Sequence, residues 1–185
     1  DLTSGQKTKV DLEVTTQTTA PEEFTIPLSF VDGWPFTNEI NTNQNNTGAG
    51  DLYNLSWNGM LVPYKIQRGT KYKYQDAEGR LQLKKDDTDN DQFKWIMVPG
   101  MGGRYISSVS IENTQSSTRK FTFKSSLAGG ALKSLSVKKG EMSSSDLVNA
   151  DGDRLLNDGE NLYILLDYNQ LYYITRIDAT YSTIK

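Results

Sequence analysis

The sequence contains no cysteine and no histidine among its 185 residues. These absences exclude disulfide bonds, thiol nucleophiles, zinc sites built from cysteine or histidine, and every mechanism that uses a histidine base. Catalysis would have to rely on carboxylates, lysine or tyrosine, as in glycoside hydrolysis by paired carboxylates. Nothing in the sequence pairs two particular carboxylates. We therefore expect a non-catalytic protein, with a carboxylate-dependent carbohydrate-active enzyme or its accessory domain as the alternative.

Long apolar runs and an excess of charge of one sign are also absent. No stretch approaches the roughly 20 apolar residues that span a bilayer, so we expect no membrane insertion. With 20 basic and 23 acidic residues the formal net charge is −3, which offers no basic surface for nucleic acid. The chain starts at Asp1 without an initiator Met and is rich in Thr, Ser and Asn. This start favours a processed, exported protein that is secreted or held at the cell surface, and an arbitrary cut in a longer chain is the alternative.

The sequence is rich in short runs of alternating apolar and polar residues, separated by Gly, Asn and Asp. Runs with this period of two predict β-strands, and hence an all-β fold. Two such runs, 9–16 and 24–30, precede an Asn-rich stretch, 38–50, whose composition is typical of a flexible linker. We therefore expect an N-terminal two-strand extension and linker in residues 1–50, and a main domain in residues 51–185.

An internal repeat predicts the architecture of the main domain. Alternating segments that begin at Gln92, Ala131 and Gln170 follow one another at intervals of 39 residues. With the shorter strands upstream of each, they suggest three units of four strands. Such units predict a β-trefoil, in which each unit buries its apolar face only against the other two. A β-sandwich is the alternative, because its turns recur at similar spacing.

The order of residues in these units resembles the repeat of ricin-type β-trefoil lectins, whose units carry a Gln-x-Trp signature. The first unit reads Tyr64-x-Ile66, Gly79-x-Leu81-x-Leu83 and Gln92-x-x-Trp95-x-Met97, and the third contains Asn169-Gln170-Leu-Tyr-Tyr173-Ile174. The resemblance covers roughly residues 61–185. It implies shallow saccharide pockets, formed by Asn169 and Gln170 with Asp153 in the last unit, and by Asp91 with Gln92 in the first.

Two tryptophans are expected in loops. Trp34 lies in the turn sequence Asp-Gly-Trp-Pro, and Trp57 precedes the turn pair Asn58-Gly59. Aromatic side chains in loops can anchor a ligand or a partner protein. The alternative is that they plug or cover the barrel.

One acidic segment has the spacing of a calcium-binding loop. Oxygen-bearing side chains stand at its first, third, fifth, ninth and twelfth positions, namely Asn149, Asp151, Asp153, Asn157 and Glu160. Arg154 takes the place of the usual glycine, and a strand follows where that motif has a helix. Turn-forming residues explain the segment without a metal, and we favour this interpretation over calcium binding. We expect no other cofactor, and a domain that binds a glycan or a protein through its loops.

Overall fold

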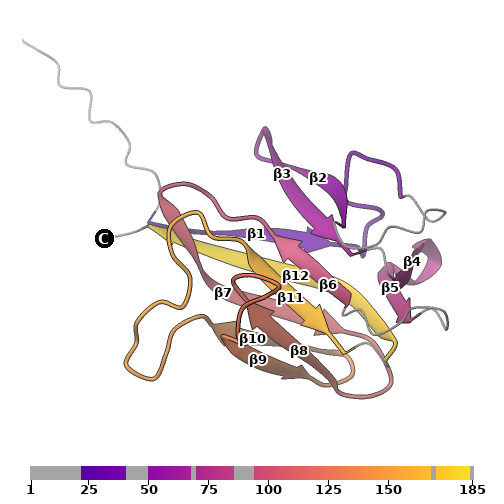
Figure 1. The fold of residues 1–185 in the computed structure, drawn as a ribbon. Coiled ribbons are helices and arrows are strands. Elements are labelled where there is room, and N and C mark those ends of the chain that lie inside the picture. The colour runs from indigo at the N-terminus through magenta and orange to yellow at the C-terminus, as the bar shows by residue number, and fades with distance from the viewer. Residues whose placement is uncertain (1–21, 41–49, 68–69, 86–93, 168–169, 184–185) are drawn as a thin grey trace, which may run out of the picture.

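The computed structural model describes residues 22–40, 50–67, 70–85, 94–167 and 170–183. In these residues twelve strands form two antiparallel sheets, and the only helix is one 3-10 turn, Asp76–Glu78 (Figure 1). The predicted all-β fold is thereby confirmed. No helix among these residues has the length and apolar character needed to cross a membrane.

Sheet A is organised around one long strand. Its order is β10 (Glu141–Asp146), β7 (Arg104–Asn113), β12 (Tyr172–Thr183), β5 (Arg80–Lys85) and β4 (Thr70–Gln75), with β1 (Glu23–Ser29) also paired to β12. The first residues of β12 pair with β5, and the rest of β12 pairs with β1 over seven positions. The strand predicted at 24–30 is therefore part of the same sheet as strands from the end of the chain.

Sheet B has a hairpin at one edge. Its order is β2 (Asp51–Trp57), β3 (Met60–Ile66), β6 (Lys94–Val98), β11 (Leu162–Leu166), β8 (Arg119–Lys124) and β9 (Lys133–Val137). The hairpin β2–β3 is closed by Asn58 and Gly59, which have φ angles of 45° and 77°. Positive φ at both central residues is the conformation of a type I′ turn, for which Asn-Gly is a preferred sequence.

The core lies between the two sheets and is rich in aromatic residues. Alternate side chains of the central strands point inward, so β12 contributes Ile177, Ala179 and Tyr181, and β8 contributes Phe121 and Phe123. Four tyrosines are among the largest fully buried side chains: Tyr53, Tyr64, Tyr172 and Tyr181. Apolar burial on this scale is the main favourable contribution to folding.

A polar network joins the two sheets inside this core. The Tyr72 hydroxyl, on β4, donates to Asp51 Oδ2, on β2, at 2.5 Å, and it also contacts the Tyr53 hydroxyl. Burial, together with these two hydrogen bonds, raises the pKa of Tyr72 well above its ordinary value. The phenol is therefore a permanent donor, which lets the Asp51 carboxylate be buried with a partner.

A second apolar cluster lies on the outer face of sheet B. Trp95 and Met97 of β6 point away from the main core and pack with Leu165 and Tyr163 of β11. The Trp95 ring meets the Tyr163 ring edge-to-face at 5.4 Å. A Cβ atom at Gly50 would come within 2.7 Å of this tryptophan, so only glycine fits there. Trp95 and Met97 are thus buried on the outer side of the sheet.

The strand pairing is that of the β-sandwich alternative, and the trefoil prediction is not confirmed. The three segments that recur at intervals of 39 residues are not equivalent, because two contain strands of sheet B, β6 and β9, whereas the third begins β12 of sheet A. Three like units would each form the same hairpins. Here β4–β5 and β8–β9 are hairpins, whereas β11 pairs with β6 and β8.

Candidate functional site

A groove opens where the β2–β3 hairpin leaves sheet B. β3 pairs with β2 along its whole length, but with β6 at only two positions, Lys65 with Met97 and Ile66 with Ile96. Beyond these pairs the hairpin and the chain that follows β6 diverge, and a groove of about 760 Å³ lies between them. Its lining combines the start of β1, the tip of the hairpin and the β6–β7 loop: Phe24, Trp57, Asn58, Met60, Leu61, Val62, Pro63, Pro99, Gly100, Met101, Gly102 and Arg104.

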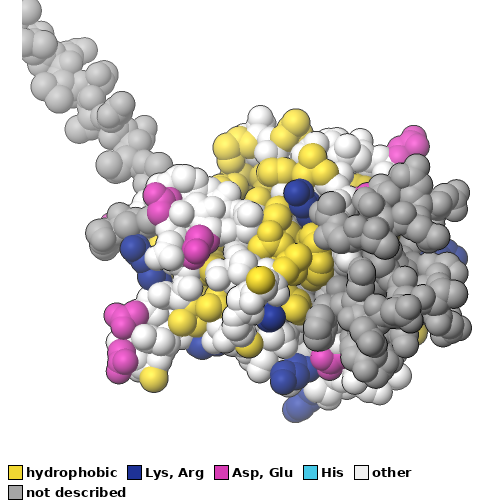
Figure 2. Space-filling view, viewed as in Figure 1, with side chains coloured by type: hydrophobic (Ala, Val, Ile, Leu, Met, Phe, Trp, Pro, Cys, Tyr) yellow, Lys and Arg dark blue, Asp and Glu magenta, His cyan; other side chains and the backbone are white. Residues whose placement is uncertain are grey.

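The surface around the hairpin is mainly apolar. Figure 2 shows hydrophobic side chains gathered over the hairpin at the top of the view and continuing toward its centre. Leu61 is 64% exposed and Met60 is 46% exposed, which are large values for apolar side chains. Exposed apolar residues that adjoin one another and a groove are typical of binding surfaces.

A stack of three aromatic rings runs from the core to the groove. The Phe24 ring lies 5.1 Å from the Trp57 ring and 5.4 Å from the Tyr181 ring, with interplanar angles of 22° and 20°. Tyr181 is fully buried, and its hydroxyl donates to the Pro99 carbonyl at 2.7 Å. Burial raises the pKa of this hydroxyl, so it stays a neutral donor. The half-buried Trp57 ring therefore packs on Phe24, which in turn packs on the fixed ring of Tyr181.

Polar groups stand at the rim of the groove. The Arg104 guanidinium lies over the Phe24 ring, with Cζ 4.6 Å from the ring centre, and Nη1 donates to the Glu22 carbonyl at 3.4 Å. The Asn58 side chain is exposed at the tip of the hairpin. The groove thus combines an apolar floor with a small number of polar groups, which is the common composition of ligand sites.

The β6–β7 loop, which forms one wall of the groove, is held by the loop before β11. Asp158 Oδ1 accepts hydrogen bonds from the amides of Gly103 at 2.6 Å and Arg104 at 3.2 Å. The amide of Gly100 donates to Asn161 Oδ1 at 2.8 Å. A Cβ atom on Gly100 would lie 2.1 Å from the Gly159 carbonyl oxygen, so the two loops touch through their backbones. Sequence reasoning missed this support, because no local pattern pairs these loops.

Of the two tryptophans predicted as anchors, the structure places only Trp57 in the groove. Trp34 packs against the rings of Phe30, Phe36, Tyr53 and Tyr74. Its indole Nε1 donates to the Asn38 carbonyl at 2.6 Å. The observed contacts of Trp34 therefore match the alternative of a core plug.

The predicted lectin residues are not brought together in the described residues. Gln170 is half-buried, and its backbone carbonyl accepts a hydrogen bond from the buried Lys94 Nζ at 2.9 Å. Asp153 lies in an exposed loop and contacts Asn149. Asn169, Asp91 and Gln92 lie outside the described residues. The saccharide pockets implied by the lectin resemblance stay a prediction.

The predicted calcium loop forms two separate turns. Asn149 Oδ1 accepts from the amides of Asp151 and Asp153, and the carboxylate of Glu160 accepts from the amide and side chain of Asn157. Among the described residues no three acidic, cysteine or histidine side chains are grouped to hold a metal ion. These side chains thus act as local caps of the backbone, as in the turn-forming alternative.

No family model matches the sequence, and no curated protein matches it. Similar solved structures include "BiXyn10A CBM1", with 12% identity over 86% of this chain and 97% of that chain and a TM-score of 0.43. Another is the CBM22-2 xylan-binding domain of Xyn10C from Paenibacillus barcinonensis, with 12% identity, coverage of 86% and 99%, and a TM-score of 0.34. The agarase AgWH50C is 5% identical over 66% of this chain, has a TM-score of 0.40, and is covered over 22% of its own length. At these TM-scores none of the three identifies a family.

Proposed function

We propose that the chain is a non-catalytic domain that binds a glycan in the groove between the β2–β3 hairpin and the β6–β7 loop. The observation that carries the proposal is the supported Trp57–Phe24 stack at the floor, with Asn58 and Arg104 at the rim. A pyranose ring has an apolar face of C–H groups and an edge of hydroxyls. The floor matches the face, and the amide and guanidinium match the edge.

Among the described residues, the lining of the groove also lacks the carboxylates that glycoside cleavage needs. Hydrolysis of a glycosidic bond uses two carboxylates on either side of the bond. None of the described residues that line the groove is Asp or Glu. A sugar held there would be bound without being cleaved. Export to the cell surface or beyond would bring such a domain into contact with glycans.

The test is a glycan array with the wild-type chain, followed by affinity measurements on the hits. We expect Trp57→Ala to weaken binding by roughly tenfold or more, about 1.4 kcal/mol or more. Asn58→Gly should weaken it as well, without straining the turn, because glycine accepts the positive φ at that position. Met142→Ala, an exposed methionine on β10 that does not line the groove, is the control. Hits that bind Trp57→Ala unchanged would refute the proposed site.

A second candidate ligand is an extended peptide. The first residues of β3, from Met60 to Tyr64, have no paired position on the side that faces β6, and Met60 and Leu61 are exposed. A peptide could add there as a strand, with main-chain hydrogen bonds for affinity. A blank glycan array, together with peptide binding that is lost on methylation of alternate peptide amides, would favour this candidate over the glycan.

A further inference from the structure

A second hollow, of about 360 Å³, lies at the same end of the sandwich on the outer face of sheet A. Three of its lining residues form a row across adjacent strands. Glu23 of β1 is paired with Ser182 of β12, which is paired with Tyr105 of β7. Arg154, from the loop before β11, closes the end of the row, with Glu22 and Thr183 completing the lining. In Figure 1 the start of β1 and the end of β12 lie together at this end.

Several polar groups in this hollow are left with hydrogen-bonding capacity. Arg154 contacts the Tyr105 ring, with Cζ 5.6 Å from the ring centre, and its guanidinium donates to none of the described residues. Glu23 has one described partner, the Ser182 hydroxyl, which lies 3.0 Å from Oε2. The Tyr105 hydroxyl has no hydrogen-bond partner in the described part of the chain. Donors, an acceptor and an aromatic ring therefore converge on one small volume.

The hollow and the groove are adjacent. The groove is lined by Phe24 and Arg104, and the hollow by the residues next to them in the chain, Glu23 and Tyr105. Successive side chains of a strand point to opposite faces, so the groove lies on the core side of these strands and the hollow on the outer face of sheet A. The two sites meet around the strand ends, at the start of β1 and the start of β7. Between the two sites lies a ridge formed by Glu22 and Arg104, in which Arg104 Nη1 donates to the Glu22 carbonyl at 3.4 Å.

The charges in the hollow indicate which sugars it would accept. Glu22 and Glu23 carry two negative charges, and Arg154 in the hollow and Arg104 at its edge carry two positive charges, so the balance of charge favours no ionic sugar. A neutral sugar has hydroxyls that can donate to the Glu23 carboxylate and accept from the Arg154 guanidinium, the strongest class of hydrogen bond available here. The Tyr105 ring can contact its apolar face.

We propose that this hollow is a second subsite, which takes a neutral sugar residue of the same glycan chain that occupies the groove. The inference rests on the proposed function. A chain bound at Trp57 would cross the ridge at Glu22 and Arg104 and place a further residue between Tyr105 and Arg154. Short oligosaccharides would reach only the groove.

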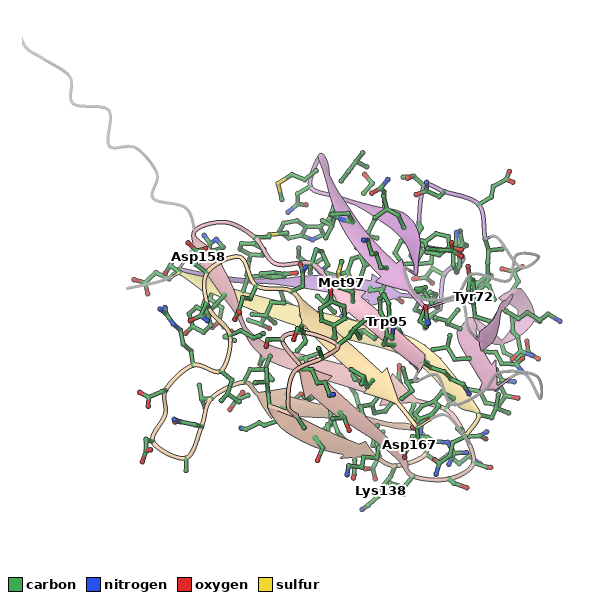
Figure 3. All side chains as sticks on the ribbon, viewed as in Figure 1. Tyr72, Trp95, Met97, Lys138, Asp158 and Asp167 are labelled. Atoms are coloured by element: carbon green, nitrogen blue, oxygen red, sulfur yellow. The ribbon has the colours of Figure 1, made fainter. Side chains whose placement is uncertain are left out.

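The experiment is calorimetric titration with neutral β-1,4-linked glucose and xylose oligomers, from the monosaccharide to the hexasaccharide. Arg154→Met should weaken binding of the longer oligomers by about tenfold, the loss of a charge-assisted hydrogen bond, and leave the shorter ones unchanged. Trp57→Ala should weaken every length that binds. Lys138→Met removes one positive charge from the opposite end of the molecule and should change nothing (Figure 3).

The outcomes separate the two proposals. If Arg154→Met binds every length as the wild type does, the second subsite is refuted and the groove remains. If uronate-bearing oligomers bind more tightly than neutral ones and depend on Arg154, the assigned sugar class is wrong. If the wild-type chain binds none of the oligomers and the glycan array is blank, the proposed function fails, and the subsite fails with it.

Discussion

Two tyrosine-to-phenylalanine substitutions should differ in their effect on stability, although both remove one buried hydroxyl. The Tyr72 hydroxyl donates to the Asp51 carboxylate and also contacts Tyr53, whereas the Tyr64 hydroxyl has no hydrogen-bond partner among the described residues. Tyr72→Phe therefore leaves a buried carboxylate without one of its donors. Tyr64→Phe removes only a group whose burial is uncompensated.

The magnitudes follow from these contacts. A hydrogen bond to a charged group contributes about 1.5–3 kcal/mol, and an unsatisfied buried partner costs a similar amount. We expect Tyr72→Phe to lower the free energy of unfolding by about 2 kcal/mol. An uncompensated buried hydroxyl costs about 1–3 kcal/mol on mutational scales. We expect Tyr64→Phe to leave stability unchanged or to raise it by up to about 1 kcal/mol.

Urea unfolding followed by tryptophan fluorescence would measure both variants against the wild type. The dependence of the unfolding free energy on urea should stay the same, so the midpoints can be compared directly. Tyr74→Phe is an intermediate control, because its half-buried hydroxyl donates to a neutral carbonyl, that of Phe30, at 3.0 Å. If Tyr72→Phe keeps the wild-type midpoint while Tyr64→Phe lowers it, the assignment of the network is wrong.

Three further predictions concern the groove wall and the buried tyrosines. Gly100→Ala should destabilise the fold by about 1–3 kcal/mol and weaken ligand binding, because the added Cβ atom would strike the Gly159 carbonyl. The control is Gly102→Ala, whose added Cβ atom would meet no atom within 4 Å and should leave thermal unfolding unchanged. Asp158→Ala should lower stability by about 1 kcal/mol, because it removes the hydrogen bonds that the carboxylate accepts from the amides of Gly103 and Arg104. Asp151→Ala is the control and should not lower stability. Equal melting temperatures for the two variants would contradict the prediction. Burial raises the pKa of Tyr172 to about 12, and raises the pKa values of Tyr64, Tyr72 and Tyr181 as well, so the folded state holds protons that the unfolded state releases near pH 10. Stability should therefore be unaffected by these groups below about pH 10 and fall as the pH rises above it. The part of the tyrosinate absorbance that these four buried groups contribute should appear together with unfolding rather than before it.

Individual strands could be predicted from the sequence because alternation is a local property. The run predicted at 24–30 overlaps β1, and the alternating segments that begin at Gln92 and Ala131 contain β6 and β9. Pairing is not local, since it depends on which apolar faces meet across the core. A regular spacing of short strands arises both in a trefoil and in a sandwich, so the interval of 39 residues did not distinguish them.

The buried charged groups illustrate a second limit. Asp51 follows the Asn-rich stretch and would be expected at the surface, yet it is 7% exposed; Lys94 is 1% exposed. Each is buried because a distant segment supplies its partner: Tyr72 for Asp51, and the Gln170 carbonyl for Lys94. Residue type gives the usual preference for the surface, whereas long-range contacts decide the exceptions.

The two loop tryptophans show why the site itself needed the structure. Both stand beside turn-forming residues, and the sequence gives no reason to separate their roles. Trp34 follows β1 at the point where the chain turns back over the core, so four aromatic rings surround it and its indole N–H is bonded to Asn38. Trp57 stands at the tip of a hairpin that leaves its sheet after two paired positions with β6. The divergence of these two strands, which no single residue encodes, leaves Trp57 beside the groove with Phe24 beneath it.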